Sequence, residues 1–399
     1  MDCKQISLKT RLLFFAVVAG LLAAGVFLFR SHRTDQATVR VLVLASASEM
    51  TGVERAVERF REVHDEYTLK LTPVSSEADF SDALGNGRGS ADIAMLPAGH
   101  TFETVAKDYF VSPASLELSR LDLSAFPAPA LESFSYDGEP RAVPIAWTPS
   151  GYFVSRRVTG TSSLPESYQG FLNLLERARK QNSRGLVLVG ERQGQVVDLF
   201  LSLMANQPAS GIATALLEDE AWFEQPQAAE AIEEFRSIYR QGLIHRSSFD
   251  YGPDDAFAVL NRDEAATVFA PADFGGRIAI DERRQYPLSR PPLQGPRRPI
   301  IVGRLVGAAI TETGSNKASA KAFLTLLADH TMQEQMASGA GPTFYAPHTS
   351  ARYPSEAART AARLLSISER IFPAGLKWVE PSSRDEVDAK LTSIILGNE

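Results

Sequence analysis

The sequence has almost no cysteine and no recognisable metal or hydrolase motif. Its single cysteine among 399 residues is Cys3, so the remainder has no disulfide, thiolate ligand or cysteine nucleophile. The histidines are scattered, and no two lie three to five residues apart as on a shared zinc ion. The Gly-x-Ser-x-Gly turn of serine hydrolases is also absent. We therefore expect no metal, no cofactor and no enzymatic activity.

Positive charge is in deficit once the first 33 residues are set aside. Residues 34–399 carry 36 Lys/Arg and 47 Asp/Glu, a net charge of about −11. An acidic protein is repelled by phosphate backbones, so we expect no nucleic-acid partner. Low-complexity stretches are also lacking, and the length suits two globular lobes better than one.

One long apolar run is present, at the N-terminus. Residues 12–29 contain no charged side chain and are long enough to cross a bilayer as a helix. Basic residues precede the run, which places the N-terminus in the cytoplasm and the body on the periplasmic or extracellular side. A cleaved secretory signal is the alternative, because Ala23-Ala24-Gly25 offers small residues to a peptidase. We predict a cytoplasmic tail over 1–11, a transmembrane helix or uncleaved signal anchor over 12–29, and a linker over 30–38.

The body alternates between strand-like and helix-like segments, which is typical of an α/β fold with a parallel sheet. Pro226 in a first turn and Gly242 just past the end mark one helix clearly. The predicted strands are 39–44, 68–74, 91–96, 141–147, 151–155, 186–189, 266–270 and 300–310. The predicted helices are 53–63, 80–84, 168–180, 195–206, 226–240 and 316–336.

Four stretches share their order and spacing with a known family. They are 137–147 followed by 151–155, 226–232 ending in 239–244, 255–257 with 265–269, and 310–335 followed by Gly341-Pro342 and Pro347. Over residues 38–350 this order resembles the family 1 extracellular solute-binding proteins, the maltose-binding-like components of ABC importers.

The resemblance implies a periplasmic-binding-protein type II fold, in which two α/β lobes close over a ligand at a hinge. Lobe 1 would comprise 39–145 and 271–310, and lobe 2 would comprise 146–270 and 311–399. A carbohydrate is the favoured solute, delivered to ABC permease subunits. Two alternatives remain: a membrane-tethered sensor or scaffold with the same fold, and an exported glycan-acting enzyme.

Ligand recognition would fall to aromatic planes and polar groups, because a sugar has apolar faces and a rim of hydroxyls. Strand ends matter as well, since open α/β sheets bind ligands at their carboxyl edge. Core packing is the alternative for the two tryptophans, and a plain turn is the alternative for 273–274. The candidate ligand-binding residues are Trp147, Trp222, Ser46, Glu49, Asp273, Phe274 and Tyr345.

Overall fold

Most of the body is described by the computed structural model of the chain. The described residues are 37–44, 47–85, 91–113, 122–190, 195–206, 225–278, 286–293, 298–339, 346–348, 356–373 and 381–397. Within these ranges, no helix is both long enough and apolar enough to span a bilayer. The helix predicted over 12–29 lies outside the described residues, so it stays a prediction.

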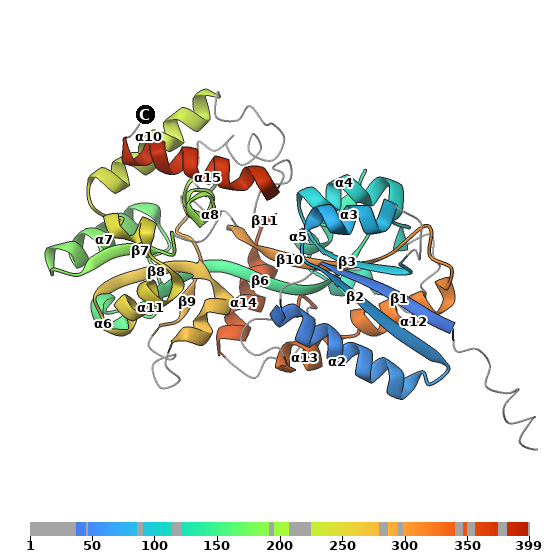
Figure 1. Ribbon diagram of the computed structural model, residues 1–399. Coiled ribbons are helices and arrows are strands. Elements are labelled where there is room, and N and C mark those ends of the chain that lie inside the picture. The colour runs from blue at the N-terminus through green and yellow to red at the C-terminus, as the bar shows by residue number, and fades with distance from the viewer. Residues whose placement is uncertain are drawn as a thin grey trace, which may run out of the picture.

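A single mixed sheet runs through the molecule from one side to the other (Figure 1). Within the described residues it has nine strands, in the order β2-β1-β3-β10-β6-β8-β7, with β11 beside β10 and β9 beside β6. The strands are β1 (Ala37–Leu44), β2 (Tyr67–Val74), β3 (Ile93–Pro97), β6 (Val143–Val154), β7 (Arg184–Leu188), β8 (Ala265–Pro271), β9 (Leu288–Ser289), β10 (Ile300–Ile310) and β11 (Arg370–Pro373). A separate small hairpin joins β4 (Ser135–Tyr136) to β5 (Glu139–Pro140).

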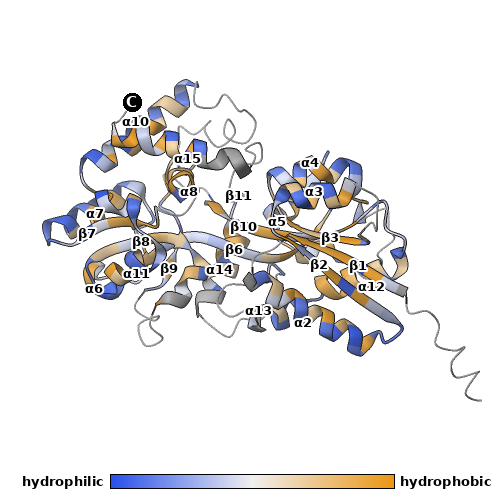
Figure 2. Cartoon of the chain, viewed as in Figure 1, coloured by the Kyte–Doolittle hydropathy of each residue, from blue (hydrophilic) through white to orange (hydrophobic). Residues whose placement is uncertain are grey.

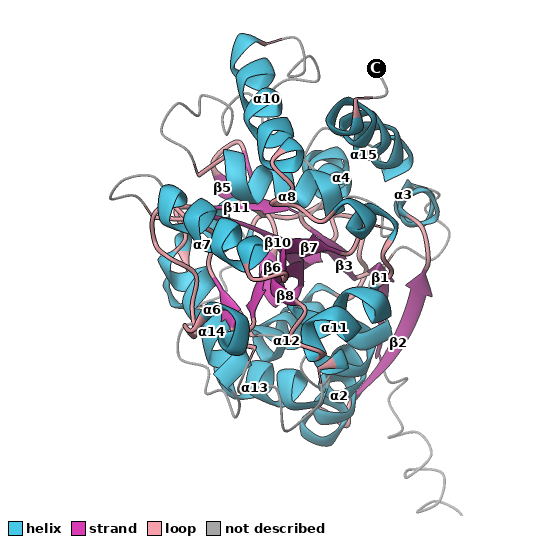
Figure 3. Ribbon diagram, turned by 90° about the vertical axis from the view of Figure 1, so that its left-hand side faces the viewer, coloured by secondary structure: helices cyan, strands magenta, loops and turns pink. Residues whose placement is uncertain are grey.

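Helices cover the sheet in two groups, one on each side of the middle of β6 (Figure 1), and helices lie both above and below the strands in the view of Figure 3. The first group surrounds β1 to β3 and comprises α2 (Ala47–Val63), α3 (Glu77–Gly85), α4 (His100–Tyr109), α5 (Ala128–Glu132), α12 (Lys317–Ala328) and α13 (His330–Gly339). The second surrounds β7 and β8 and comprises α6 (Arg156–Thr159), α7 (Tyr168–Lys180), α8 (Gln195–Met204), α10 (Pro226–Arg240), α11 (Pro253–Asn261) and α15 (Pro381–Leu396). One further helix, α14 (Glu356–Ile367), packs against β6 and β9.

Apolar side chains concentrate on the strands and on the helix faces turned toward them (Figure 2). In the first group the rings of Phe60 and Phe323 meet edge to face, with centroids 5.1 Å apart. In the second group α7, α8, α10 and α15 enclose a core of their own. A third cluster, called here the shared core, contains Phe134 from the first group, Phe153 and Phe257 from the second, and Trp147.

The long strand β6 differs from the prediction of two shorter strands over 141–147 and 151–155. It continues through Pro144 and Pro149, although proline lacks the N–H that a central strand needs. Each proline lies opposite a glycine of β10, Gly307 and Gly303 respectively, and the ladder is irregular next to Gly307. The space beside Gly307 is taken by the ring of Phe134, and the space beside Gly303 by the indole of Trp147 and the backbone of Thr148 and Pro149.

The predicted helix over 316–336 is in fact two helices. The chain leaves α12 at Asp329, whose backbone is extended, and its carboxylate then accepts hydrogen bonds from the backbone N–H groups of Thr331 and Met332. An aspartate that caps a new first turn in this way favours a break. Both helices pack against α2 and lie with the first group, whereas α15, which is also within 311–399, packs with α8 and α10 of the second.

Candidate ligand-binding site at the crossing strands

Strand ends from both groups meet at the middle of β6. Strand β10 is antiparallel to both β3 and β6, whereas β6 is antiparallel to β8, so β3 and β8 run in opposite directions. The carboxyl end of β3, at Pro97, is level with Ala146 across β10, and the carboxyl end of β8, at Pro271, pairs with Ser150. Because ligands of open α/β sheets bind at carboxyl edges, residues 146–150 mark the natural site.

The close approach of the two crossing strands depends on Gly303. A Cβ at this position would lie 2.7 Å from the backbone oxygen of Thr148 and 2.7 Å from the indole of Trp147. Real Cβ atoms do not approach so closely, so any other residue would push β10 away from β6. The neighbouring residue, Arg304, is thereby held directly opposite Thr148.

Glu49 lies at this junction, as the sequence predicted, but its carboxylate contacts a protein side chain. It sits in the first turn of α2, after the carboxyl end of β1, and is only 3% exposed. Its Oε1 accepts a hydrogen bond from Nε of Arg304 over 2.9 Å. Arg304 was not predicted, although a lone charge inside the apolar segment 300–310 is a usable signal.

Trp147 is fully buried in the shared core. Its indole Nε1 donates to the backbone oxygen of Ala361 in α14 over 3.2 Å, so the one polar atom of the side chain is satisfied internally. This geometry is the core packing that was weighed against a sugar-stacking role. A role for Trp147 as a ligand platform stays a prediction.

Asp273 and Phe274 follow the carboxyl end of β8, in a 3-10 turn over Ala272–Arg277. Both are half-buried, and Phe274 packs against the shared core. They are therefore near Ser150, the partner of Pro271, as a site residue at the strand end should be. The other three candidates, Ser46, Trp222 and Tyr345, lie outside the described residues.

Two fully buried side chains at helix starts each have a polar atom with no hydrogen-bond partner among the described residues. Oγ1 of Thr101 is in the first turn of α4, which follows β3, and Oε1 of Gln195 begins α8, which follows β7. Each residue is 3% exposed. Because buried polar atoms normally have partners, both are candidates for hydrogen bonds to a ligand. The sequence does not identify these two residues, because they are recognised only by the burial of their polar atoms in the folded structure.

Among the described residues, no group of three or more His, Asp or Glu side chains is arranged to hold a metal ion. The polar groups that follow the ends of β1, β3 and β7 are instead a carboxylate paired with Arg304, a hydroxyl and a carboxamide. Such groups exchange hydrogen bonds with a polar organic ligand.

Comparison with known proteins gives matches in structure only. No protein-family model and no curated protein matches the sequence. The bacterial solute receptor AcbH, described as preferring β-D-galactopyranose, is similar with a TM-score of 0.80 and 11% identity, over 92% of this chain and 94% of that chain. The sugar-binding protein MalE of Xanthomonas citri is similar with a TM-score of 0.73 and 14% identity, over 91% and 93%.

A family 1 extracellular solute-binding protein from Bifidobacterium longum subsp. infantis is similar with a TM-score of 0.71 and 14% identity, over 91% of this chain and 95% of that chain. Identities this low establish a shared fold and no more. The resemblance seen in the sequence is confirmed at that level: the chain has the mixed α/β fold of the family 1, maltose-binding-like solute-binding proteins.

Proposed function

We propose that this chain is an extracytoplasmic solute-binding protein that takes up a carbohydrate and delivers it to the permease subunits of an ABC importer. The observation that carries the proposal is the meeting of carboxyl strand ends from two groups of elements at residues 146–150. The fold supports it, because AcbH is described as a galactopyranose receptor and the MalE3 structure of T. maritima holds maltose.

Closure of the two groups over the ligand is the proposed mechanism. Strands β6 and β10 connect the groups within the sheet, so a few residues in 144–147 and 270–275 would absorb the backbone change. Both groups supply polar side chains near strand ends: Thr101 and Arg304 in one, Gln195 and Asp273 in the other. A ligand between them would contact both groups and thereby favour the closed form.

Membrane tethering completes the proposal. The charge-free run 12–29 would anchor the protein and leave residues 34–399 on the outer side of the membrane. Alkaline extraction of membranes should leave the full chain in the pellet and release a chain that begins at residue 34. Release of a shortened chain from cells that express the full sequence would show instead that the run is cleaved, and release of the uncleaved full chain would contradict anchoring.

Calorimetric titration of residues 34–399 against sugars, amino acids and polyamines tests the function. We expect binding by a carbohydrate only, with a rise in melting temperature and a smaller radius of gyration in solution scattering. Binding confined to a non-carbohydrate would contradict the proposal. Uptake of the labelled sugar should also fall when the protein is deleted from cells; unchanged uptake with intact binding would favour the sensor or scaffold.

A further inference from the structure

Arg304 is an unusual residue for its position. Strand β10 is central in the sheet, and Arg304 is its only position that is not buried. Its side chain is 38% exposed, and a charge within a central strand carries a desolvation cost that neighbouring apolar residues do not. Packing alone does not require a guanidinium at this position. We therefore looked for a partner that its N–H groups could bind.

Only part of that capacity is used by the described residues. Nε donates to Glu49, whereas no acceptor among the described residues contacts the two terminal nitrogens, Nη1 and Nη2. Glu49 is 3% exposed and lies in the first turn of α2, so it is a fixed acceptor. Because the guanidinium is planar, a bond at Nε fixes the orientation of the whole group. The edge formed by Nη1 and Nη2 can then donate hydrogen bonds to a ligand.

The edge formed by Nη1 and Nη2 presents two parallel N–H donors and no acceptor. Its geometry matches the two oxygens of a carboxylate, which guanidinium groups bind through paired, charge-assisted hydrogen bonds. A pair of sugar hydroxyls could accept from it as well, but they gain less because they carry no charge. The partial exposure of Arg304 means that the ligand carboxylate could reach it without displacing a protein group.

From this geometry we infer that the ligand is an acidic carbohydrate whose uronate carboxylate binds Nη1 and Nη2 of Arg304, with Glu49 as a positioning residue. The inference rests on the proposed function and narrows its ligand class. It also revises the predicted role of Glu49, which would orient the arginine and not contact the sugar. Formal charge within the pair cancels, so selectivity would arise from local hydrogen bonds and depend weakly on salt.

Matched sugars isolate the carboxylate in a titration of residues 34–399 at pH 7. Two pairs of matched monosaccharides are galacturonate with galactose and glucuronate with glucose, and oligomers of these four sugars form a further set. The remaining probes are acetate, inorganic phosphate and galactose 6-phosphate. We expect the uronate of at least one pair to bind at least about tenfold more tightly than its neutral partner, as charge-assisted bonds imply.

Substitutions then assign the selectivity to one side chain. Arg304→Gln should abolish the uronate preference, Arg304→Lys should retain part of it, and Glu49→Gln should reduce it while Arg304 is still present. Arg240→Gln on the outer face of α10 removes the same charge from an exposed position and should change nothing. Melting temperatures of all four variants separate loss of binding from loss of folding.

Each outcome bears on the inference. A uronate preference that disappears in Arg304→Gln and not in Arg240→Gln supports it. Equal binding of neutral and acidic sugars overturns the inference and leaves the proposed function intact. A uronate preference that survives Arg304→Gln has the same consequence. Binding confined to the phosphate probes overturns the assignment of a carboxylate. Failure of every carbohydrate to bind overturns the proposed function itself.

Discussion

At the scale of single residues, His245 couples stability to pH. Its Nδ1 is buried without a hydrogen-bond partner among the described residues, and its ring stacks on Tyr251. Burial lowers the pKa of His245 below its ordinary value of 6.5, and the nearby Arg184 cation lowers it further. The folded protein therefore keeps this histidine neutral at a pH where the unfolded chain already binds a proton.

The free energy of unfolding should thus decrease as the pH falls from 6.5 toward the lowered folded-state pKa. His245→Asn removes the titrating group, so its loss of stability over the same interval should be smaller. Urea unfolding midpoints at pH 7.5 and 5.5, measured for both proteins, provide the check. Identical losses in the two proteins would show that His245 contributes nothing to the pH dependence.

Residue-level prediction from the sequence succeeded where local order decides the outcome. Glu49 was placed at the carboxyl edge because a strand and then a helix bracket it. Its partner Arg304 is 255 residues away, and no periodicity links the two. The burial of Trp147 depends likewise on Ala361 of α14, a helix for which no element is predicted.

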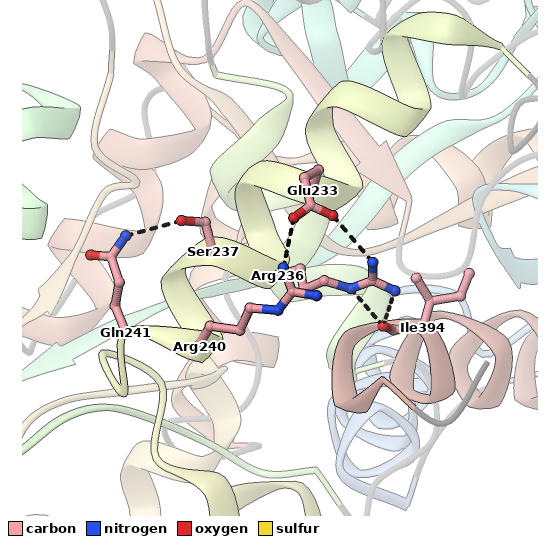
Figure 4. A network of polar contacts seen from close by, with 6 residues as sticks. All are labelled: Glu233, Arg236, Ser237, Arg240, Gln241 and Ile394. Atoms are coloured by element: carbon pink, nitrogen blue, oxygen red, sulfur yellow. Dashed lines mark hydrogen bonds and ion pairs between the residues drawn. The ribbon is translucent and has the colours of Figure 1, made fainter.

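At the scale of elements, the C-terminal helix α15 is held to α10 by one arginine (Figure 4). Nε and Nη2 of Arg236 both donate to the backbone oxygen of Ile394, the Nε bond over 2.8 Å, in the last turn of α15. Glu233 accepts from Nη1 of the same side chain over 3.2 Å. A cation at a helix C-terminus also interacts favourably with the helix dipole.

We expect Arg236→Ala to lower the free energy of unfolding by about 1–3 kcal/mol, the usual range for a hydrogen bond to a charged donor. Arg240→Ala is the matched control, because among the described residues Arg240 bonds only to Glu233, and it is 61% exposed; it should cost less than about 1 kcal/mol. Chemical denaturation of both variants measures the difference. Equal costs would mean that the contact with Ile394 does not stabilise the docking of α15.

Elements with strong local signals are the ones that sequence predicts well. The helices at 168–180 and 226–240 match the prediction, since Ser167 caps one and Pro226 opens the other. The C-terminal helix α15 has a weaker signal: in its described part the fully buried apolar positions are Leu391 and Ile395. Two such positions do not make a clear amphipathic stripe, so tertiary contacts determine that this helix forms.

At the scale of the whole molecule, the order of segments predicted the fold, but it did not show on which group of elements each returning segment packs. Residues 317–339 follow the last crossing strand and pack on α2, because their apolar face completes the core around Phe60 and Phe323. Sequence order cannot show to which side of a crossing strand the chain returns. Hydrophobic complementarity between distant segments decides it.

The shared core makes a further prediction about how the molecule unfolds. It combines Phe134 of the first group with Phe153 and Phe257 of the second, and Trp147 lies among them, so neither group can bury this surface alone. The sheet is also continuous through β6 and β10. We therefore expect both groups to unfold together, in one cooperative transition, although two lobes could in principle unfold separately.

A variant of residues 34–399 with Trp222→Phe and Trp378→Phe leaves Trp147 as the single fluorescent reporter of the shared core. Its emission should shift to the red at the same denaturant concentration at which the far-ultraviolet circular dichroism of the whole molecule is lost. The calorimetric and van't Hoff enthalpies should also agree, as they do for two-state unfolding. Two separated transitions, or a fluorescence change that precedes the loss of secondary structure, would instead mean that each group has sufficient core of its own and that the surface around Trp147 opens first.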